Sequence, residues 1–263
     1  MARSGSTLMC RCLGCMQGVV LLSELHPRAS LNGAFKQAKE WFGLLTQSDI
    51  AELQKPGSAN YTKAIMLIEQ RCRARGATLV LRDWAHLDYT GYPHLTTPAY
   101  RPLLYAELAD SFDIIRISTT RDPVTQWQSL IQLALLQEPL RSGAFGLDQF
   151  LLGYRKYAEL CVETGFVRYE DFTVNPDLAM RKLCDHLQIK FDPDFIKKWP
   201  DYKTITGDVP SPDGPRESKM PYDSNRILPH SKRPVEPGLK KKFLANADYH
   251  RACELLGYSL LEE

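Results

Sequence analysis

The stretch that decides the fold lies at the start of the chain and reads Met1-Ala2-Arg3-Ser4-Gly5-Ser6-Thr7-Leu8-Met9. Small and hydroxyl-bearing residues run directly into an apolar pattern with helical spacing, carried by Leu8, Cys12 and Met16. The backbone N–H groups of residues 4–7 are therefore predicted to lie at a helix start, where they have no partner within the helix. A helix start attracts anions, and Arg3 adds a charged donor fork. The stretch predicts an anion-binding loop.

A second candidate anion site lies near the middle of the chain, where residues 114–129 read Ile-Ile-Arg-Ile-Ser-Thr-Thr-Arg-Asp-Pro-Val-Thr-Gln-Trp-Gln-Ser. The run from Asp113 to Thr120 is predicted as a strand. Pro123 suits the first position of a helix, and Asp122 can cap that helix. Arg121 then lies beside a second helix start, with Ser129 about two turns further on. Taken singly, Arg121 could form a surface ion pair and Ser129 a helix-surface hydroxyl, but together with the first stretch they favour an anion site.

These two segments resemble the sulfotransferase family. In that family a loop like residues 3–7 binds the 5′-phosphosulfate of 3′-phosphoadenosine-5′-phosphosulfate (PAPS), and an Arg and a Ser spaced as Arg121 and Ser129 hold its 3′-phosphate. Residues 167–176 resemble the family's strand-to-helix segment, whose tyrosine, here Tyr169, lies near the adenine. The local pattern is most similar to that of the tyrosylprotein sulfotransferases. The resemblance implies a three-layer, P-loop-like α/β fold, in which helices flank a central, mostly parallel sheet.

Length and composition suit one large domain over residues 1–263, since 44% of the 263 residues are hydrophobic and 24% are charged. The net charge of +2 indicates no general attraction to nucleic acid or to a membrane surface. The apolar run at residues 8–22 is interrupted by Arg11 and resembles neither a membrane span nor a signal peptide. Seven cysteines, an odd number, favour a reducing compartment, so we expect a cytoplasmic protein.

The cysteines near the start of the chain do not predict a metal site. A structural zinc site needs thiolates that converge in a tetrahedron. On the predicted helix, Cys12 and Cys15 share a face while Cys10 points elsewhere. Free cysteine is also a common small core residue. We therefore expect no metal.

Two residues are candidates for the catalytic base that sulfuryl transfer to a hydroxyl requires. Glu24 ends an apolar strand predicted over residues 19–24, and the resemblance places it, with Arg3, on catalytic positions of the tyrosylprotein sulfotransferases. Glu24 could instead pair with a nearby arginine. His86 follows a second predicted strand, Thr78 to Asp83, at the sheet edge where parallel sheets bind ligands. Its ring could serve as the base or be a structural core histidine.

The rest of the sequence predicts alternating helices and strands, and its composition changes beyond Pro200. Residues 200–237 are rich in Pro, Gly, Ser, Asp and Lys, and form a long loop or lid. Sulfotransferases often close a basic loop over the nucleotide, so Arg226 or Lys232 could complete the 3′-phosphate site. The simpler account is a solvated loop. Two short helices are predicted from Gly238 onward.

The chain departs from the family pattern at one point. The family's phosphate loop follows a central strand, but here Met1 and Ala2 directly precede the loop, so that first strand is missing. A parallel sheet without it would leave backbone groups unpaired, at about 1–3 kcal/mol for each buried group. Our hypothesis is that the recorded start lies downstream of the real one. The alternative is a fold that tolerates the gap and binds nucleotide weakly.

The sequence thus predicts a sulfotransferase that moves the sulfuryl group of PAPS to an acceptor hydroxyl on a tyrosine, a carbohydrate or a small alcohol. A P-loop kinase would need a lysine in the loop, and residues 1–9 contain none. The remaining alternative is an N-terminally incomplete, non-catalytic nucleotide-binding or scaffold protein of the same fold. The acceptor and the oligomeric state stay open.

Overall fold

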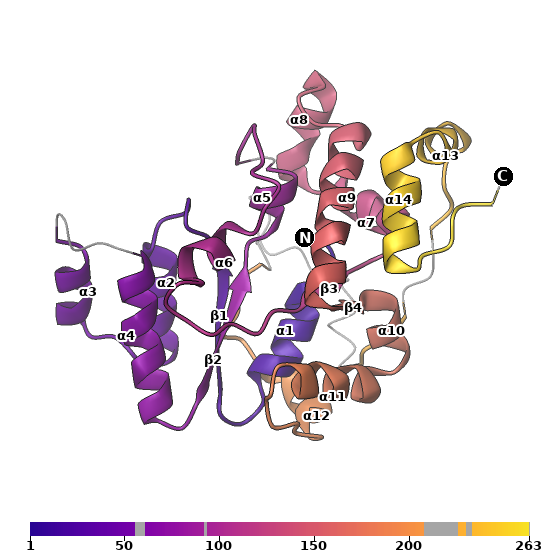
Figure 1. The fold of residues 1–263 in the computed structure, drawn as a ribbon. Coiled ribbons are helices and arrows are strands. Elements are labelled where there is room, and N and C mark those ends of the chain that lie inside the picture. The colour runs from indigo at the N-terminus through magenta and orange to yellow at the C-terminus, as the bar shows by residue number, and fades with distance from the viewer. Residues whose placement is uncertain (56–60, 92–93, 208–225, 230–232, 263) are drawn as a thin grey trace.

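Two pairs of parallel strands form the centre of the computed structural model (Figure 1), which describes residues 1–55, 61–91, 94–207, 226–229 and 233–262. Strand β1 (Val19–Leu25) pairs with β2 (Thr78–Asp83), and β3 (Ser118–Thr120) pairs with β4 (Phe166–Arg168). Parallel neighbours need a crossover connection, which is usually helical. Here α4 (Tyr61–Ala74) precedes β2, and α9 (Leu147–Thr164) joins β3 to β4. The predicted α/β class with parallel strands flanked by helices is confirmed.

Further helical segments lie around these strands. They are α1 (Ser6–Gly14), α2 (Asn32–Lys36), η1 (Gln37–Trp41), α3 (Gln47–Leu53), α5 (His86–Tyr89), α6 (Leu103–Leu108), α7 (Pro123–Leu130), η2 (Ala134–Leu136), α8 (Gln137–Ser142), α10 (Tyr169–Val174), α11 (Pro176–His186), α12 (Phe195–Lys198), η3 (Trp199–Asp201), α13 (Pro237–Leu244) and α14 (Ala247–Leu256). Among the described residues, no helix is both long enough and apolar enough to cross a membrane.

The predicted start of α7 is confirmed in detail. Asp122 caps the helix, since its Oδ1 accepts a hydrogen bond from the Thr125 backbone N–H at 2.8 Å, and Pro123 holds the first helical position. Asn175 caps α11 in the same way through the Leu178 N–H, at 3.1 Å. These caps satisfy amide groups that a helix start leaves without an intrahelical partner.

The strand predicted from Asp113 to Thr120 is wrong in its first half. Only Ser118–Thr120 form β3, because β4 offers three partners and no other described strand pairs with this segment. Residues 112–117 run without regular structure, and Ile115 is 42% exposed. An apolar run becomes a strand only where a neighbour accepts its backbone hydrogen bonds.

Strand β2 has the predicted bounds but is less buried than its partner strand. All of its residues are at least partly exposed, whereas six of the seven residues of β1 are buried. The two strand pairs are separate sheets with a gap between them, and they do not form one continuous sheet. The N-terminus lies in the interior beside this gap, and Met1 is only 8% exposed (Figure 1).

The two helices predicted at the end of the chain are confirmed, while the long loop or lid over residues 200–237 stays a prediction. The described parts of residues 200–237 contain η3 and otherwise irregular chain, and α13 and α14 are the two final helices. Arg226 lies exposed at its described position. Lys232 lies outside the described residues, so its proposed role stays a prediction.

We predict that Gly153→Ala destabilises the protein. A Cβ atom at this position in α9 would lie 2.0 Å from the backbone oxygen of Tyr89, so α9 and α5 would have to separate. We expect a loss of about 1–3 kcal/mol in the free energy of unfolding, the usual range for overpacking. Helix propensity alone would give a gain of about 0.5–1 kcal/mol.

Chemical denaturation of the variant and of Gly33→Ala measures this effect. Gly33 lies in α2, and a Cβ atom added there would meet no other atom within 4 Å, so this control should be neutral or stabilising. Equal stability changes in the two variants would contradict the packing of α9 against α5.

Candidate active site

The predicted anion-binding loop lies at the start of α1, as its sequence indicates. Gly5 precedes the helix with a φ of 83°, and no side chain caps the first turn. A Cβ atom on Gly5 would lie 2.1 Å from the Cδ2 atom of Tyr169, so the position needs glycine for both its backbone and its space. The loop therefore packs directly against the tyrosine that the resemblance places near the adenine.

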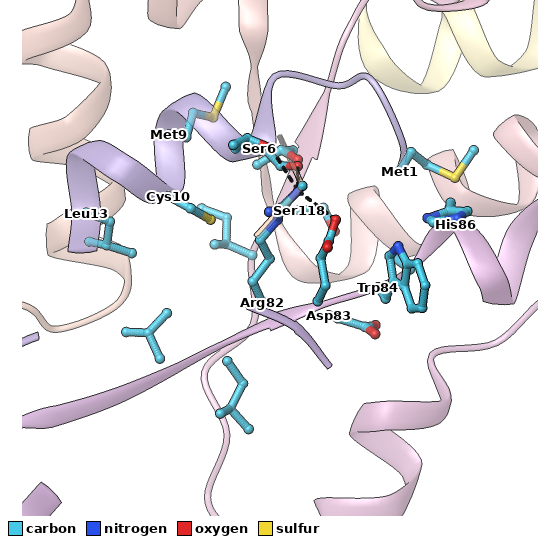
Figure 2. A pocket seen from close by; sticks show the side chains of 18 of the residues that line it. Met1, Ser6, Met9, Cys10, Leu13, Arg82, Asp83, Trp84, His86 and Ser118 are labelled. Atoms are coloured by element: carbon cyan, nitrogen blue, oxygen red, sulfur yellow. Dashed lines mark hydrogen bonds and ion pairs between the residues drawn. The ribbon is translucent and has the colours of Figure 1, made fainter. Parts of the chain in front are cut away.

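Arg82 is the functional candidate that sequence reasoning missed. Figure 2 shows its side chain extending from β2 toward the start of α1. One terminal nitrogen, Nη2, donates to Ser6 Oγ at 3.2 Å and to Thr7 Oγ1 at 3.0 Å. The other, Nη1, donates to Ser23 Oγ at 3.1 Å and to the Thr206 carbonyl at 3.0 Å. The sequence signal that could have identified Arg82 was the presence of a charged residue near the carboxyl end of an otherwise apolar strand.

Glu24 lies beside this guanidinium because of a break in the strand. The register of β1 against β2 shifts between Ser23 and Leu25, and Glu24 adopts a φ of 55°. A bulge of this kind re-aims a side chain, and a non-glycine residue in the left-handed region costs about 1–3 kcal/mol. The Glu24 carboxylate thus comes within 3.9 Å of Arg82 and is 23% exposed. Gly207 covers it, since a Cβ there would lie 2.9 Å from Oε1.

The two predicted anion sites adjoin in the structure. The Nε atom of Arg3 donates to Ser129 Oγ at 3.0 Å, and Nη1 of Arg121 donates to the Arg3 carbonyl at 3.4 Å. The Arg121 guanidinium lies 4.8 Å from the centre of the Tyr169 ring. Two arginines from segments far apart in the sequence therefore lie on the same side of the molecule, around one tyrosine.

Ser4 differs from the other loop residues because its side chain is used internally. Its hydroxyl is buried, donates to the Met1 carbonyl at 2.8 Å and lies 3.0 Å from Thr119 Oγ1. These bonds anchor the loop to β3. Ser4 is fully buried and does not line the cavity.

His86, the second candidate base, lies on the other side of Arg82, next to Met1 (Figure 2). Its ring packs edge-on against Trp84 at 5.3 Å and lies 6.2 Å from the ring of His94. Burial, with a smaller effect of the Met1 amino group, lowers the pKa of His86 to about 3. A neutral imidazole with so low a pKa is a poor proton acceptor near neutral pH.

His26 is a structural residue. Its Nε2 lies 3.0 Å from Asp88 Oδ1, and its Nδ1 accepts a hydrogen bond from the Arg28 N–H. The other carboxylate oxygen of Asp88 accepts from the Leu103 N–H at 2.9 Å. Both side chains are fully buried, so this pair fixes the loops behind the site.

All of these candidate residues except Ser4, His26 and Asp88 line one cavity of about 2170 Å³. The cavity runs from the anion-binding loop past Glu24 and His86 and continues between β2 and residues 114–119. Among the described residues, no three metal-binding side chains converge. Burial raises the pKa of the Cys15 thiol to about 11 and that of Cys12 as well, so both remain protonated.

Parallel strands flanked by helices define an α/β protein, and its arginines gather at an uncapped helix start. The family model for the sulfotransferase family matches residues 1–193, more than half of the chain. The chain therefore belongs to the sulfotransferase family, as its loop and its central segment predicted.

Two solved structures have a similar fold. The first is the sulfotransferase domain from the olefin synthase of Synechococcus PCC 7002, with a TM-score of 0.60 and 16% identity over 99% of this chain and 93% of that one. The second is the sulfotransferase domain from the curacin biosynthetic pathway, with a TM-score of 0.60 and 16% identity over 98% of this chain and 95% of that one. No curated protein sequence matches the chain. The predicted P-loop-like fold agrees with these structures, while specificity for protein tyrosine stays a prediction.

We predict a pH-dependent effect of Asp83→Asn. Burial, with the nearby Asp88 charge, raises the pKa of Asp83 from 3.8 to about 7. Between these values the unfolded chain loses the proton that the folded chain keeps, so Asp83 makes the protein less stable as the pH rises. The asparagine variant lacks this contribution and should gain stability relative to the wild type from about pH 5 to about pH 8.

Urea unfolding of both proteins at the two pH values checks this expectation. Asp110→Asn, at an exposed position, is the matched control and should show no such gain. A constant difference between Asp83→Asn and the wild type across the pH range would contradict the raised pKa of the Asp83 carboxyl.

Proposed function

We propose that this protein transfers the sulfuryl group of PAPS to a hydroxyl of an acceptor molecule. Membership of the sulfotransferase family supports the transferase class, and the site supports the donor and the reaction. The observation that carries the proposal is the convergence of Arg82, the hydroxyls of Ser6 and Thr7, and the Glu24 carboxylate at the start of α1.

The donor would be held by residues on both sides of Tyr169. Backbone amides of residues 4–7 and Arg3 would bind the 5′-phosphosulfate, because a helix start and a guanidinium both favour an anion. Arg121 and Ser129 would bind the 3′-phosphate, and Tyr169 would lie against the adenine. The Gly5 position supports this assignment, since a larger residue there would displace the tyrosine ring.

PAPS supplies the sulfuryl group when it is bound: the acceptor oxygen forms a bond to sulfur while the bond from sulfur to the 5′-phosphate oxygen breaks. Glu24 would take the acceptor proton, because its carboxylate is partly exposed and adjoins the anion-binding loop. Arg82 would stabilise the negative charge on the leaving phosphate through the positive charge of its guanidinium, which its internal hydrogen bonds hold in place. A positioned general base typically contributes about 10²–10⁴-fold to the rate.

The acceptor would enter from the side of the cavity lined by Trp84, His86 and His94. These rings suit a tyrosine, a carbohydrate or a small alcohol, so the acceptor class stays open. We propose a cytoplasmic enzyme that acts without a metal; the odd number of cysteines, seven, favours a reducing compartment. We propose neither nucleic acid nor a membrane as a partner.

Binding of the reaction product tests the donor. We expect calorimetry to detect 3′,5′-bisphosphoadenosine binding at least about tenfold tighter than ATP, because the second anion site matches a 3′-phosphate that ATP lacks. Equal or tighter binding of ATP would contradict the proposal that PAPS is the donor. Tight binding without turnover of PAPS on any acceptor class would instead favour the non-catalytic scaffold.

Glu24→Gln tests the base. The variant keeps the shape of the side chain but cannot take a proton, so kcat should fall by about 10²-fold or more with unchanged affinity for the bisphosphate. Glu254→Gln, at a 70% exposed side chain, is the control and should keep full activity. Full activity of Glu24→Gln together with inactivity of His86→Ala would indicate that His86, and not Glu24, is the catalytic base.

A further inference from the structure

Arg121 lies in a two-residue link between two elements of regular structure. β3 ends at Thr120 and α7 begins at Pro123, so Arg121 and Asp122 belong to neither element. The carbonyl of Arg121 and the N–H of Asp122 are the two polar groups of one planar peptide unit. The pairing of β3 with β4 stops at Thr120, so these strands do not bond this unit. Its orientation, which sets how the Arg121 side chain leaves the backbone, must come from other contacts.

Two side chains bind this peptide unit at its two polar groups. The Tyr154 hydroxyl, on α9, donates to the Arg121 carbonyl at 2.5 Å, and Tyr154 is fully buried. Glu170 Oε1, on α10, accepts a hydrogen bond from the Asp122 N–H at 3.0 Å. Glu170 directly follows Tyr169, whose ring centre lies 4.8 Å from the Arg121 guanidinium. The backbone beside the arginine is thus bonded to the same short helix that carries the facing ring.

Glu170 is held in turn by Tyr258. Its second oxygen, Oε2, accepts a hydrogen bond from the Tyr258 hydroxyl at 3.1 Å, and the same hydroxyl lies 3.1 Å from Thr120 Oγ1. A carboxylate only accepts and a phenol has one proton, so Tyr258 donates to Glu170 and accepts from Thr120. Burial, with the charge of Glu170, raises the pKa of the Tyr258 hydroxyl, which therefore keeps this proton. One continuous network thus binds the residues on both sides of Arg121.

The turn after α14 brings Tyr258 to this network. Gly257 follows the helix with a φ of 69°, a left-handed conformation that suits glycine. The Tyr258 N–H then donates to the Cys253 carbonyl at 3.0 Å. The Gly257 carbonyl accepts from Nη1 of Arg168 at 3.0 Å, and Arg168 is the last residue of β4. The turn is therefore bonded to the strand end that leads into α10, while α14 packs against α9 (Figure 1).

We propose that Glu170 and Tyr258 are positioning residues that hold the Arg121 guanidinium in the direction of the donor's 3′-phosphate. The inference rests on the proposed function, in which Arg121 binds that phosphate. Neither residue has to touch the ligand, because Glu170 acts through the Asp122 N–H and Tyr258 acts through Glu170. A guanidinium that is already oriented loses less freedom when the ligand binds, so the network raises the affinity for the 3′-phosphate.

Two variants that keep every charge of the network test the proposal. Glu170→Asp shortens the side chain by one methylene group, so it cannot reach both the Asp122 N–H and the Tyr258 hydroxyl. Tyr258→Phe removes only that hydroxyl. Calorimetry compares their affinities for 3′,5′-bisphosphoadenosine and for adenosine 5′-monophosphate, which lacks the 3′-phosphate. We expect the bisphosphate to bind at least about tenfold weaker to Glu170→Asp and at least about threefold weaker to Tyr258→Phe, while monophosphate affinity changes by less than about twofold.

Tyr249→Phe is the matched control. Tyr249 lies on α14, and its hydroxyl accepts a hydrogen bond from the Leu261 N–H at 3.1 Å, which is not part of the network. This variant loses a tyrosine hydroxyl from the same part of the chain and should bind both ligands as the wild type does. An equal loss of affinity for both ligands in Glu170→Asp and Tyr258→Phe, or no loss for the bisphosphate, overturns the proposal.

Arg121→Met separates this inference from the proposed function. We expect this variant to lose its preference for the bisphosphate, and we expect Tyr258→Phe added to it to cause no further loss, because the two residues act on the same contact. The same loss from Tyr258→Phe with and without Arg121 overturns the positioning role alone. An unchanged preference in Arg121→Met would contradict the 3′-phosphate assignment of the proposed function, and this inference with it.

Discussion

The guanidinium of Arg82 is the contact on which the site depends. Its four hydrogen bonds join β2 to the start of α1, to Ser23 at the end of β1 and to the Thr206 carbonyl. Hydrogen bonds to a charged group contribute about 1.5–3 kcal/mol each, so this side chain fixes the loop in place. It also holds positive charge beside Glu24, at a point where a helix start already favours anions.

The second constraint is the contact between the two anion-binding segments. Arg3 meets Ser129, Arg121 meets the backbone of the first loop, and Tyr169 packs between them. Gly5 makes this approach possible, because any side chain there would collide with the tyrosine ring. Residues separated by more than a hundred positions thus form one surface that carries two arginines.

Local patterns predicted much of this arrangement. Helix caps such as Asp122, the bounds of β2 and the helix start at residues 4–7 follow from the chemistry of neighbouring residues, and the structure confirms them. The wrong strand prediction and the missed role of Arg82 have a common cause. The strand from Asp113 to Thr120 needs a neighbouring strand along its whole length, which the described residues supply only at Ser118–Thr120, and the role of Arg82 depends on which loops converge at the end of β2. Neither partner lies nearby in the sequence, so periodicity could not predict them.

The affinity of Arg82→Met for 3′,5′-bisphosphoadenosine tests the central claim most directly, because methionine keeps much of the side-chain bulk but removes every donor. Arg251→Met is the matched control, since Arg251 pairs only with Glu254 among the described contacts and its side chain is 52% exposed. The account predicts binding at least about tenfold weaker for Arg82→Met and unchanged for the control. Equal affinity of both variants and the wild type, with the fold intact, would contradict it.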